Sequence, residues 1–294
     1  QFFTAANFLS YANALNVVRA ANTTVGNAAA PHNSAANTAA YTSMQVRDSD
    51  HYFTTFDPEQ GGAIGGGISN FANNGPFLAK WAGELGNSLK VSICPGDRPA
   101  SDGNLTGTVA WDQSGSALSG TGTLFIDELR VGDLIKITGE TGNHLIISIT
   151  NATTAGCVAL DSSDDADVSA TTATRLKRSV FSTPSGNLKG TVAVTADSTT
   201  VTGTGTLFDI QMQVGDTITV NGESKRVATI TSNTVIVTSE KFLAAASSQA
   251  YSREWEYRGA FNEGPPTTSS FADNRDMAND EIHVALVDED GEWT

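Results

Sequence analysis

The chain is poor in charged residues, above all basic ones, and in cysteine. Only 17% of its 294 residues are charged, and 17 lysines and arginines stand against 32 aspartates and glutamates, which gives a formal net charge of −15. Because such a surface repels phosphate, duplex nucleic acid is not an expected partner. The two cysteines, Cys94 and Cys157, lie in different segments. We expect two free, buried thiols rather than a disulfide or a metal site.

Long apolar runs are also missing. No run is long enough to span a bilayer, so membrane insertion is not expected. The first residues, Gln1-Phe2-Phe3, lack the basic leader of a signal peptide. The chain is instead rich in Gly (28 residues), Thr, Ser, Ala and Asn, the composition of a β-rich, turn-rich protein. Its length is sufficient for two or three domains with their own cores.

One sequence block occurs twice. Residues 107–137 and 190–220 align without a gap at an offset of 83, and 14 of the 31 positions are identical. Both copies contain GTVA, GTGTLF and VGD in the same order. The repeat predicts two copies of one supersecondary unit. Repeated small β modules are commonly scaffolds or binding surfaces and seldom house an active site.

Short β-branched runs predict strands in both copies, with Gly-Thr-Gly-Thr and Val-Gly-Asp as turns. The strands expected in the first copy are 108–111, 117–121, 134–138, 144–149, 157–160 and 174–176. Those expected in the second are 191–195, 200–202, 217–220, 225–231, 235–238 and 250–252. Short, evenly spaced strands with glycine-rich turns favour a closed or nearly closed barrel, which leaves no exposed edge.

Alternation of polar and apolar residues predicts two further strands, at 87–94 and 281–287. We expect them to pair antiparallel although both repeats lie between them, because closure entropy grows only with the logarithm of length. The predicted fold is mainly β with a small α+β core, and two repeated small β-barrel-like modules are inserted between neighbouring strands of the core domain. The expected domain ranges are 1–99 and 257–294 for the core, 100–180 for the first module and 181–256 for the second.

The N-terminal part of the core has weaker patterns. They predict a helix over 3–13, strands over 15–20, 41–46 and 51–55, a glycine-rich linker over 61–67, and a strand and turn over 76–83. The glycine-rich linker lacks the Gly-Lys-Ser/Thr of a phosphate-binding loop.

Three segments outside the repeats resemble motifs of the tail sheath proteins of contractile-tailed bacteriophages. FFTAANFLSYANALNVVRAAN (2–22) resembles the N-terminal helix and strand of that family. FLAKWAGELGNSLKVSIC (77–94) resembles one of its core strands, with Trp81-Ala82 where the family often has an aromatic residue and Pro. DEIHVALVDEDGEWT (280–294) is similar to its next strand and turn. The two repeats match no module of the family residue by residue, so their role stays open.

The resemblance implies a structural subunit without enzymatic activity or cofactor, located in the virion and assembled in the host cytoplasm. Such subunits stack helically as six-membered rings around a tail tube, and the sheath contracts to drive the tube through the host envelope. Expected partners are other sheath subunits, the tail tube protein and the baseplate. Both ends look cut, so we expect a fragment without the terminal arms that add strands to neighbouring subunits.

No catalytic, cofactor-binding or metal-binding residue is predicted. The histidines, His32, His51, His144 and His283, stand in different contexts without an evident partner, and structural or solvated roles are expected. The acidic segment Asp161–Asp167 offers oxygen atoms suited to calcium but lacks the glycine and terminal Glu of an EF-hand. A solvated loop is favoured there, and ion binding stays open. Asp288-Glu289-Asp290 is interpreted as a hairpin turn.

Asp133 and Asp216 recur after Val-Gly at equivalent positions. We expect turn residues whose carboxylates accept backbone N–H groups rather than paired catalytic acids. The tryptophans at 81, 111, 255 and 293 are scattered, so no aromatic platform for sugars or bases is expected.

Two other classes of function compete with the sheath. One is a β-repeat adhesin or a receptor- or glycan-binding protein of the virion surface, because Thr/Gly-rich β repeats also decorate phage fibres and bacterial surfaces. The other, a hydrolase, is disfavoured because no triad, carboxylate pair or metal spacing emerges.

Overall fold

The computed structural model describes residues 79, 81, 84–101, 103–160, 167–275, 277 and 280–291. The elements predicted before residue 76, most of 76–83 and the resemblance at 2–22 therefore lie outside the described residues. The chain divides into two compact units, and Val91–Leu286 belong to the one that contains both repeats. The described residues of the other unit are 79, 81, 84–90 and 287–291.

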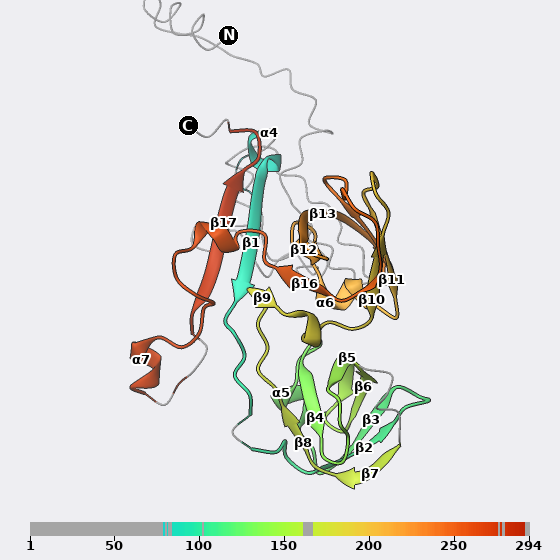
Figure 1. Cartoon of the computed structure of the whole chain (residues 1–294). Coiled ribbons are helices and arrows are strands. Elements are labelled where there is room, and N and C mark those ends of the chain that lie inside the picture. The colour runs from blue at the N-terminus through green and yellow to red at the C-terminus, as the bar shows by residue number, and fades with distance from the viewer. Residues whose placement is uncertain are drawn as a thin grey trace, which may run out of the picture. The chain divides into compact units, whose positions relative to one another are not determined.

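The fold is mainly β, as predicted, and the first repeat forms a seven-stranded sheet, module 1 (Figure 1). Its strands are β2 (Thr108–Asp112), β3 (Ala117–Thr121), β4 (Leu134–Ile137), β5 (His144–Asn151), β6 (Thr154–Ala159), β7 (Val168–Thr171) and β8 (Ala173–Arg175). A four-residue helix, α5 (Phe125–Glu128), connects β3 to β4.

The second repeat forms an eight-stranded sheet, module 2. Its strands are β9 (Ser182–Thr183), β10 (Thr191–Val194), β11 (Thr200–Thr204), β12 (Thr217–Val220), β13 (Glu223–Ser232), β14 (Val235–Thr238), β15 (Ala246–Gln249) and β16 (Tyr251–Glu254). The helix α6 (Phe208–Gln211) takes the place of α5, and a 3₁₀ turn, η2 (Ser185–Asn187), precedes β10.

The two modules have the same strand order. It is β7-β2-β3-β6-β5-β4-β8 in module 1 and β15-β10-β11-β14-β13-β12-β16 in module 2, where β9 adds to the free side of β16. In each module the two ends of this order are consecutive strands of the chain, with only Thr172 or Ala250 between them. Each sheet therefore curls until its first and last strands are two halves of one bent segment, which makes the modules barrel-like.

Residues that are identical in both copies explain why both adopt this shape. Gly107 and Gly190 have φ angles of 78° and 77°, and a Cβ at either position would overlap a carbonyl oxygen of the paired strand. The hydroxyls of Thr123 and Thr206 donate to the carbonyls of Ala152 and Asn233, at 2.8 and 2.7 Å, and so attach the turn before each helix to the β5–β6 or β13–β14 hairpin.

Each module has its own apolar core. Fully buried members include Phe125, Leu118 and Ile135 in module 1, and Phe208 and Ile218 in module 2. Phe125 and Phe208 are equivalent, and both have no exposed surface. In β10, β11 and β12 the buried Val and Ile residues alternate with more exposed Thr or Ala residues, which is the period-two pattern of a half-buried sheet.

The predicted pairing of the strands that flank the repeats is confirmed. β1 (Leu89–Pro95) and β17 (Ile282–Asp288) form a two-stranded sheet, with opposite strand directions in Figure 1. The N–H of Glu289 donates to the carbonyl of Ser88 at 2.9 Å, beyond one end of this pair. Both modules therefore lie within the connection between two neighbouring antiparallel strands.

The residues that enter and leave each module lie side by side. Arg98 and Arg178, before and after module 1, exchange two backbone hydrogen bonds of 2.9 Å. Around module 2, the N–H of Trp255 donates to the carbonyl of Phe181 at 3.0 Å. Each module can therefore be inserted into a chain without separating the residues on its two sides.

The sequence analysis missed several short elements. The strands β7, β9 and β15 and the helices α5 and α6 were not expected, and neither were α4 (Glu84–Asn87), α7 (Ser270–Asp273) and the 3₁₀ turn η3 (Arg258–Ala260). The segment from 84 to 87 is a helical turn, so the strand predicted from 87 begins at Leu89 instead. The helices have four residues each, which is too few for a helical period to be visible in the sequence.

Candidate functional site

The Val-Gly-Asp sequence makes the same turn in both modules. Asp133 Oδ2 accepts the N–H of Arg130 at 2.8 Å, and Asp216 Oδ2 accepts the N–H of Gln213 at 2.7 Å. The predicted turn role of both aspartates is therefore confirmed. Both carboxylates are also buried. A buried carboxylate is stable only when it is paired, and the two modules provide different partners.

In module 2 the partner is Arg253 on the adjacent strand β16. Its Nε donates to Asp216 Oδ2 at 2.7 Å and its Nη2 to Oδ1 at 3.3 Å, and both side chains are almost fully buried. Such a bidentate pair is among the stronger polar contacts in proteins. Burial nevertheless raises the pKa of Asp216 above its ordinary value, because desolvation outweighs the opposing effect of Arg253.

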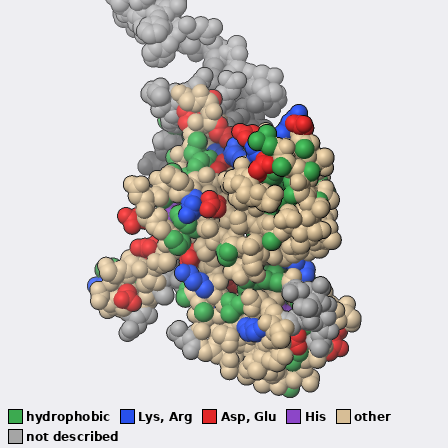
Figure 2. All heavy atoms as spheres, viewed as in Figure 1, with side chains coloured by type: hydrophobic (Ala, Val, Ile, Leu, Met, Phe, Trp, Pro, Cys, Tyr) green, Lys and Arg blue, Asp and Glu red, His purple; other side chains and the backbone are tan. Residues whose placement is uncertain are grey.

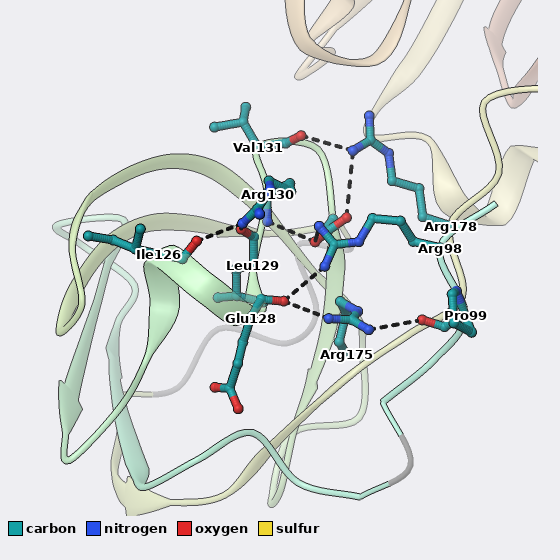
Figure 3. A network of polar contacts seen from close by, with 10 residues as sticks. Arg98, Pro99, Ile126, Glu128, Leu129, Arg130, Val131, Arg175 and Arg178 are labelled. Carbon is teal, nitrogen blue, oxygen red and sulfur yellow. Dashed lines mark hydrogen bonds and ion pairs between the residues drawn. The ribbon is translucent and has the colours of Figure 1, made fainter. Parts of the chain in front are cut away.

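In module 1 the residue equivalent to Arg253 is Arg175, since these two arginines pair with the equivalent residues Ile135 and Ile218. Arg175 does not bind the aspartate. Its guanidinium donates instead to the carbonyls of Glu128, at 2.6 Å, and Pro99, at 3.3 Å (Figure 3).

Asp133 is paired with two arginines that lie outside the sheet of module 1. Arg98 lies 3.2 Å from Oδ2 and Arg178 lies 3.6 Å from Oδ1. Arg178 also donates to the carbonyl of Val131 at 3.0 Å (Figure 3). Burial lowers the pKa of both arginines, and the charge of Asp133 opposes that shift. The cluster thus attaches the entering and leaving segments to the module, which is a structural role.

The sequence analysis missed these arginines. A signal was present, because extending the repeat alignment past residues 137 and 220 brings Arg175 and Arg253 together once five residues of the first copy are left unmatched. The arginines at 98 and 178 have no such signal, because they belong to the connections and not to the repeat.

The two histidines that the structure describes both pack against aromatic rings. His144 is fully buried, with its ring 4.3 Å from that of Trp111. The Nε2 of His283 lies 2.9 Å from the carbonyl oxygen of Gly264, and its ring stacks on Phe261 at 4.2 Å. His32 and His51 lie outside the described residues.

Both thiols are free and buried, which confirms the prediction for Cys94 and Cys157. Burial raises the pKa of Cys94 to about 12, so its thiol stays protonated and unreactive near neutral pH.

Trp255 belongs to an aromatic cluster that the sequence analysis did not predict. Trp255 packs against Phe181, Tyr257 and Phe261 at ring distances of 5.4 to 6.4 Å, and His283 joins them. Its indole N–H donates to Ser92 Oγ of β1 at 2.9 Å. This aromatic cluster covers one face of the β1–β17 pair, together with Cys94 and Ala285. The sequence analysis considered only the tryptophans and so missed the phenylalanines.

A groove of about 740 Å³ lies beside this cluster, between the segment that joins the modules and the loop after module 2. Asp97, Lys177, Phe181, Asn262 and Glu263 are among its lining residues. Asp97 is 3% exposed, and its Oδ2 lies 3.5 Å from the Lys177 ammonium. Its Oδ1 has no hydrogen-bond donor among the residues that the structure describes. This groove is the candidate binding site of the chain.

Metal binding finds no support in the described part of the chain, where no group of three or more His, Cys, Asp or Glu side chains could hold an ion. Residues 161–166 of the acidic segment lie outside it, and Asp167 accepts the N–H of Gln113 at 3.0 Å. Asp288 ends β17 and a bend follows, but residues 292–294, where the second strand of the predicted hairpin begins, are not described.

Comparison with protein-family models, curated proteins and solved structures finds no match to this chain. Among the residues described, every helix falls short of the length and hydrophobicity that crossing a membrane requires.

Proposed function

We propose that this chain is part of a structural subunit of a contractile phage tail sheath, which surrounds the tail tube and shortens to drive it through the host envelope. One observation carries the proposal. The two segments that resemble sheath core strands, 77–94 and 280–294, contribute β1 and β17, and these strands pair although two modules separate them in the sequence. The resemblance required that pairing.

The construction of the modules supports the proposal. Because the segments entering and leaving each module are adjacent, a module adds mass to the subunit without altering the strands that flank it. The buried ion pairs belong to structural joints. We therefore assign the modules to the periphery of the subunit, with no enzymatic activity and no cofactor.

The surface supports assembly with other subunits rather than with nucleic acid. Alternate residues of β17, Ile282, Val284 and Leu286, are 57%, 47% and 65% exposed, so one face of the β1–β17 pair presents apolar side chains. Apolar strips of this kind are common at interfaces between proteins. On the face seen in Figure 2, lysine and arginine side chains are scattered among acidic ones and form no broad basic patch.

Electron microscopy of the full-length protein that contains this chain tests the proposal. We expect tubes or stacked rings. Leu286→Lys should prevent their formation, because it places a charge in the apolar strip. Leu243→Lys is the matched control, since Leu243 is 79% exposed on module 2 and should tolerate the change. Isolated monomers or trimers of the unaltered protein under all conditions would contradict the proposal.

A glycan-binding protein of the virion surface is the second candidate. The groove at Asp97 favours it, because polar side chains and two phenylalanines line one open depression. Either kind of protein could carry such a groove.

A further inference from the structure

We propose that the groove beside Asp97 binds a neutral saccharide. Its volume of about 740 Å³ lies in the range of small-molecule sites, which is about 300 to 1,000 Å³. This inference deepens the second candidate function, on which it rests, and does not depend on the sheath assignment, because it concerns one groove and not assembly.

The first argument is the free oxygen of Asp97. A carboxylate oxygen that is buried without a donor costs free energy, and the lost stability is recovered only when a donor arrives. The single negative charge of Asp97 already faces the Lys177 ammonium, at 3.5 Å from Oδ2. Oδ1 therefore needs a hydrogen-bond donor rather than a second cation, and a hydroxyl group is a donor without charge.

The second argument concerns how a ligand reaches Asp97 Oδ1. Lys177 lines the groove and is 63% exposed, so its long side chain can shift at little cost. A ligand hydroxyl can then reach Oδ1 while the ammonium stays beside Oδ2 and keeps the charge of Asp97 paired.

The third argument is the balance of charge. Two acidic residues, Asp97 and Glu263, and two basic ones, Lys177 and Arg258, line the groove. The Nη1 of Arg258 is 3.0 Å from Glu254, and its guanidinium lies 5.7 Å from the centre of the Phe181 ring. A strongly charged ligand meets as much repulsion as attraction here, so the groove suits a neutral one.

The fourth argument is the remaining lining. Hydroxyl and amide side chains that can both donate and accept come from Ser179, Ser182, Thr183, Asn187 and Asn262. Phe181, Phe261, Pro184 and Pro265 provide apolar surface between them. Alternating hydroxyl and C–H groups are the surface of a sugar ring, which matches both kinds of lining.

The test uses the unaltered chain and a panel of neutral hexoses, N-acetylhexosamines and their disaccharides. Saturation-transfer NMR detects binding, and the shifts of backbone amides in a titration locate it. At least one sugar should shift Gly259, Asn262 and Gly264. Asp97→Ala should weaken binding about ten-fold or more, since it removes one buried acceptor. Asn262→Ala should weaken it several-fold, and Asn233→Ala, an exposed asparagine outside the groove, should leave it unchanged.

Three results would overturn the inference. The first is that no sugar of the panel shifts the groove amides at about 50 mM, well above millimolar dissociation constants. The second is that binding is unaffected by Asn262→Ala, which lies on the surface and should fold even if Asp97→Ala does not. The third is that a cationic probe, spermidine, shifts these amides while the sugars do not.

Discussion

The two modules share a backbone and a buried aspartate but differ in how that aspartate is neutralised. In module 2 the partner, Arg253, belongs to the sheet itself. In module 1 the equivalent Arg175 binds carbonyl groups, while Asp133 pairs with Arg98 and Arg178 from the connecting segments. Both Val-Gly-Asp turns thus contain a buried carboxylate that is paired with arginine. The arginine comes from the sheet in module 2 and from the connecting segments in module 1.

The modules also differ at the position three residues after Arg175 and Arg253. Arg178, in the segment after module 1, lies next to Gly132, whereas the equivalent Glu256, in the segment after module 2, lies next to Gly215 and pairs with Arg226 of β13. Arg178 therefore ties a connecting segment to Asp133, and Glu256 ties one to the sheet. Module 2 is more self-contained, and module 1 depends more on its surroundings.

The largest effect should come from a position where the modules agree. Phe125→Ala and Phe208→Ala should each destabilise their own module by about 3–5 kcal/mol, because each removes a fully buried ring. Urea unfolding followed by NMR signals of each module measures the two losses. Leu243→Ala is the control and should cost less than about 0.5 kcal/mol. Losses that differ by more than about 2 kcal/mol would show that the two cores are not equivalent.

The next largest effect should differ between the two modules. Arg253→Met should destabilise module 2 by about 3 kcal/mol or more, since it leaves Asp216 buried without its partner. Arg175→Met should cost module 1 only about 1–2 kcal/mol, because Asp133 keeps Arg98 and Arg178. The same unfolding experiment compares them. Equal losses would refute the claim that the charge is supplied differently.

The pH dependence should distinguish the wild type from Asp216→Asn. The folded-state pKa of Asp216 is raised by burial, so the folded protein holds this proton more tightly than the unfolded chain does. The resulting stability is fully present below the ordinary Asp pKa of about 3.9 and is lost as pH rises through the raised value. The advantage of the wild type over Asp216→Asn should therefore shrink as pH rises from about 4. An advantage that grows instead would mean that Arg253 outweighs desolvation.

The smallest effect should follow from removing a whole module. Replacing residues 100–177 by two glycines joins segments that already exchange hydrogen bonds at Arg98 and Arg178. Module 2 should keep its unfolding free energy within about 1 kcal/mol, as expected for separate cores. The matched variant replaces residues 182–254, between Phe181 and Trp255, whose backbones are hydrogen-bonded. Loss of structure in the module that remains would show that the modules fold only together.

Much of the fold could be predicted from the sequence, because the two copies of the repeat give two strand patterns for the same unit. The strands 117–121, 217–220 and 235–238 were predicted to the residue. The run 217–220, for example, is entirely β-branched and lies between Asp216 and Asn221. The bent strands β7 and β15 were missed because Ala170 and Ser248 adopt positive φ in segments without a glycine.

The candidate groove could not be predicted. Asp97 lies 80 positions before Lys177, and Asn262 is a further 85 away. These residues come together only because distant segments pair in the fold, and no sequence motif predicts that pairing. The turn role of Asp133 and Asp216 was predictable because it is local, whereas their arginine partners are not.

The bridge between Arg98 and Arg178 determines how load passes through the molecule. Tension applied to the strands on either side of module 1 reaches this bridge and its ion pairs before it reaches the barrel. As long as these bonds hold, the barrel lies outside the force path and experiences no stretching. In the proposed sheath, this bridge would let the subunits move apart while the side modules remain folded.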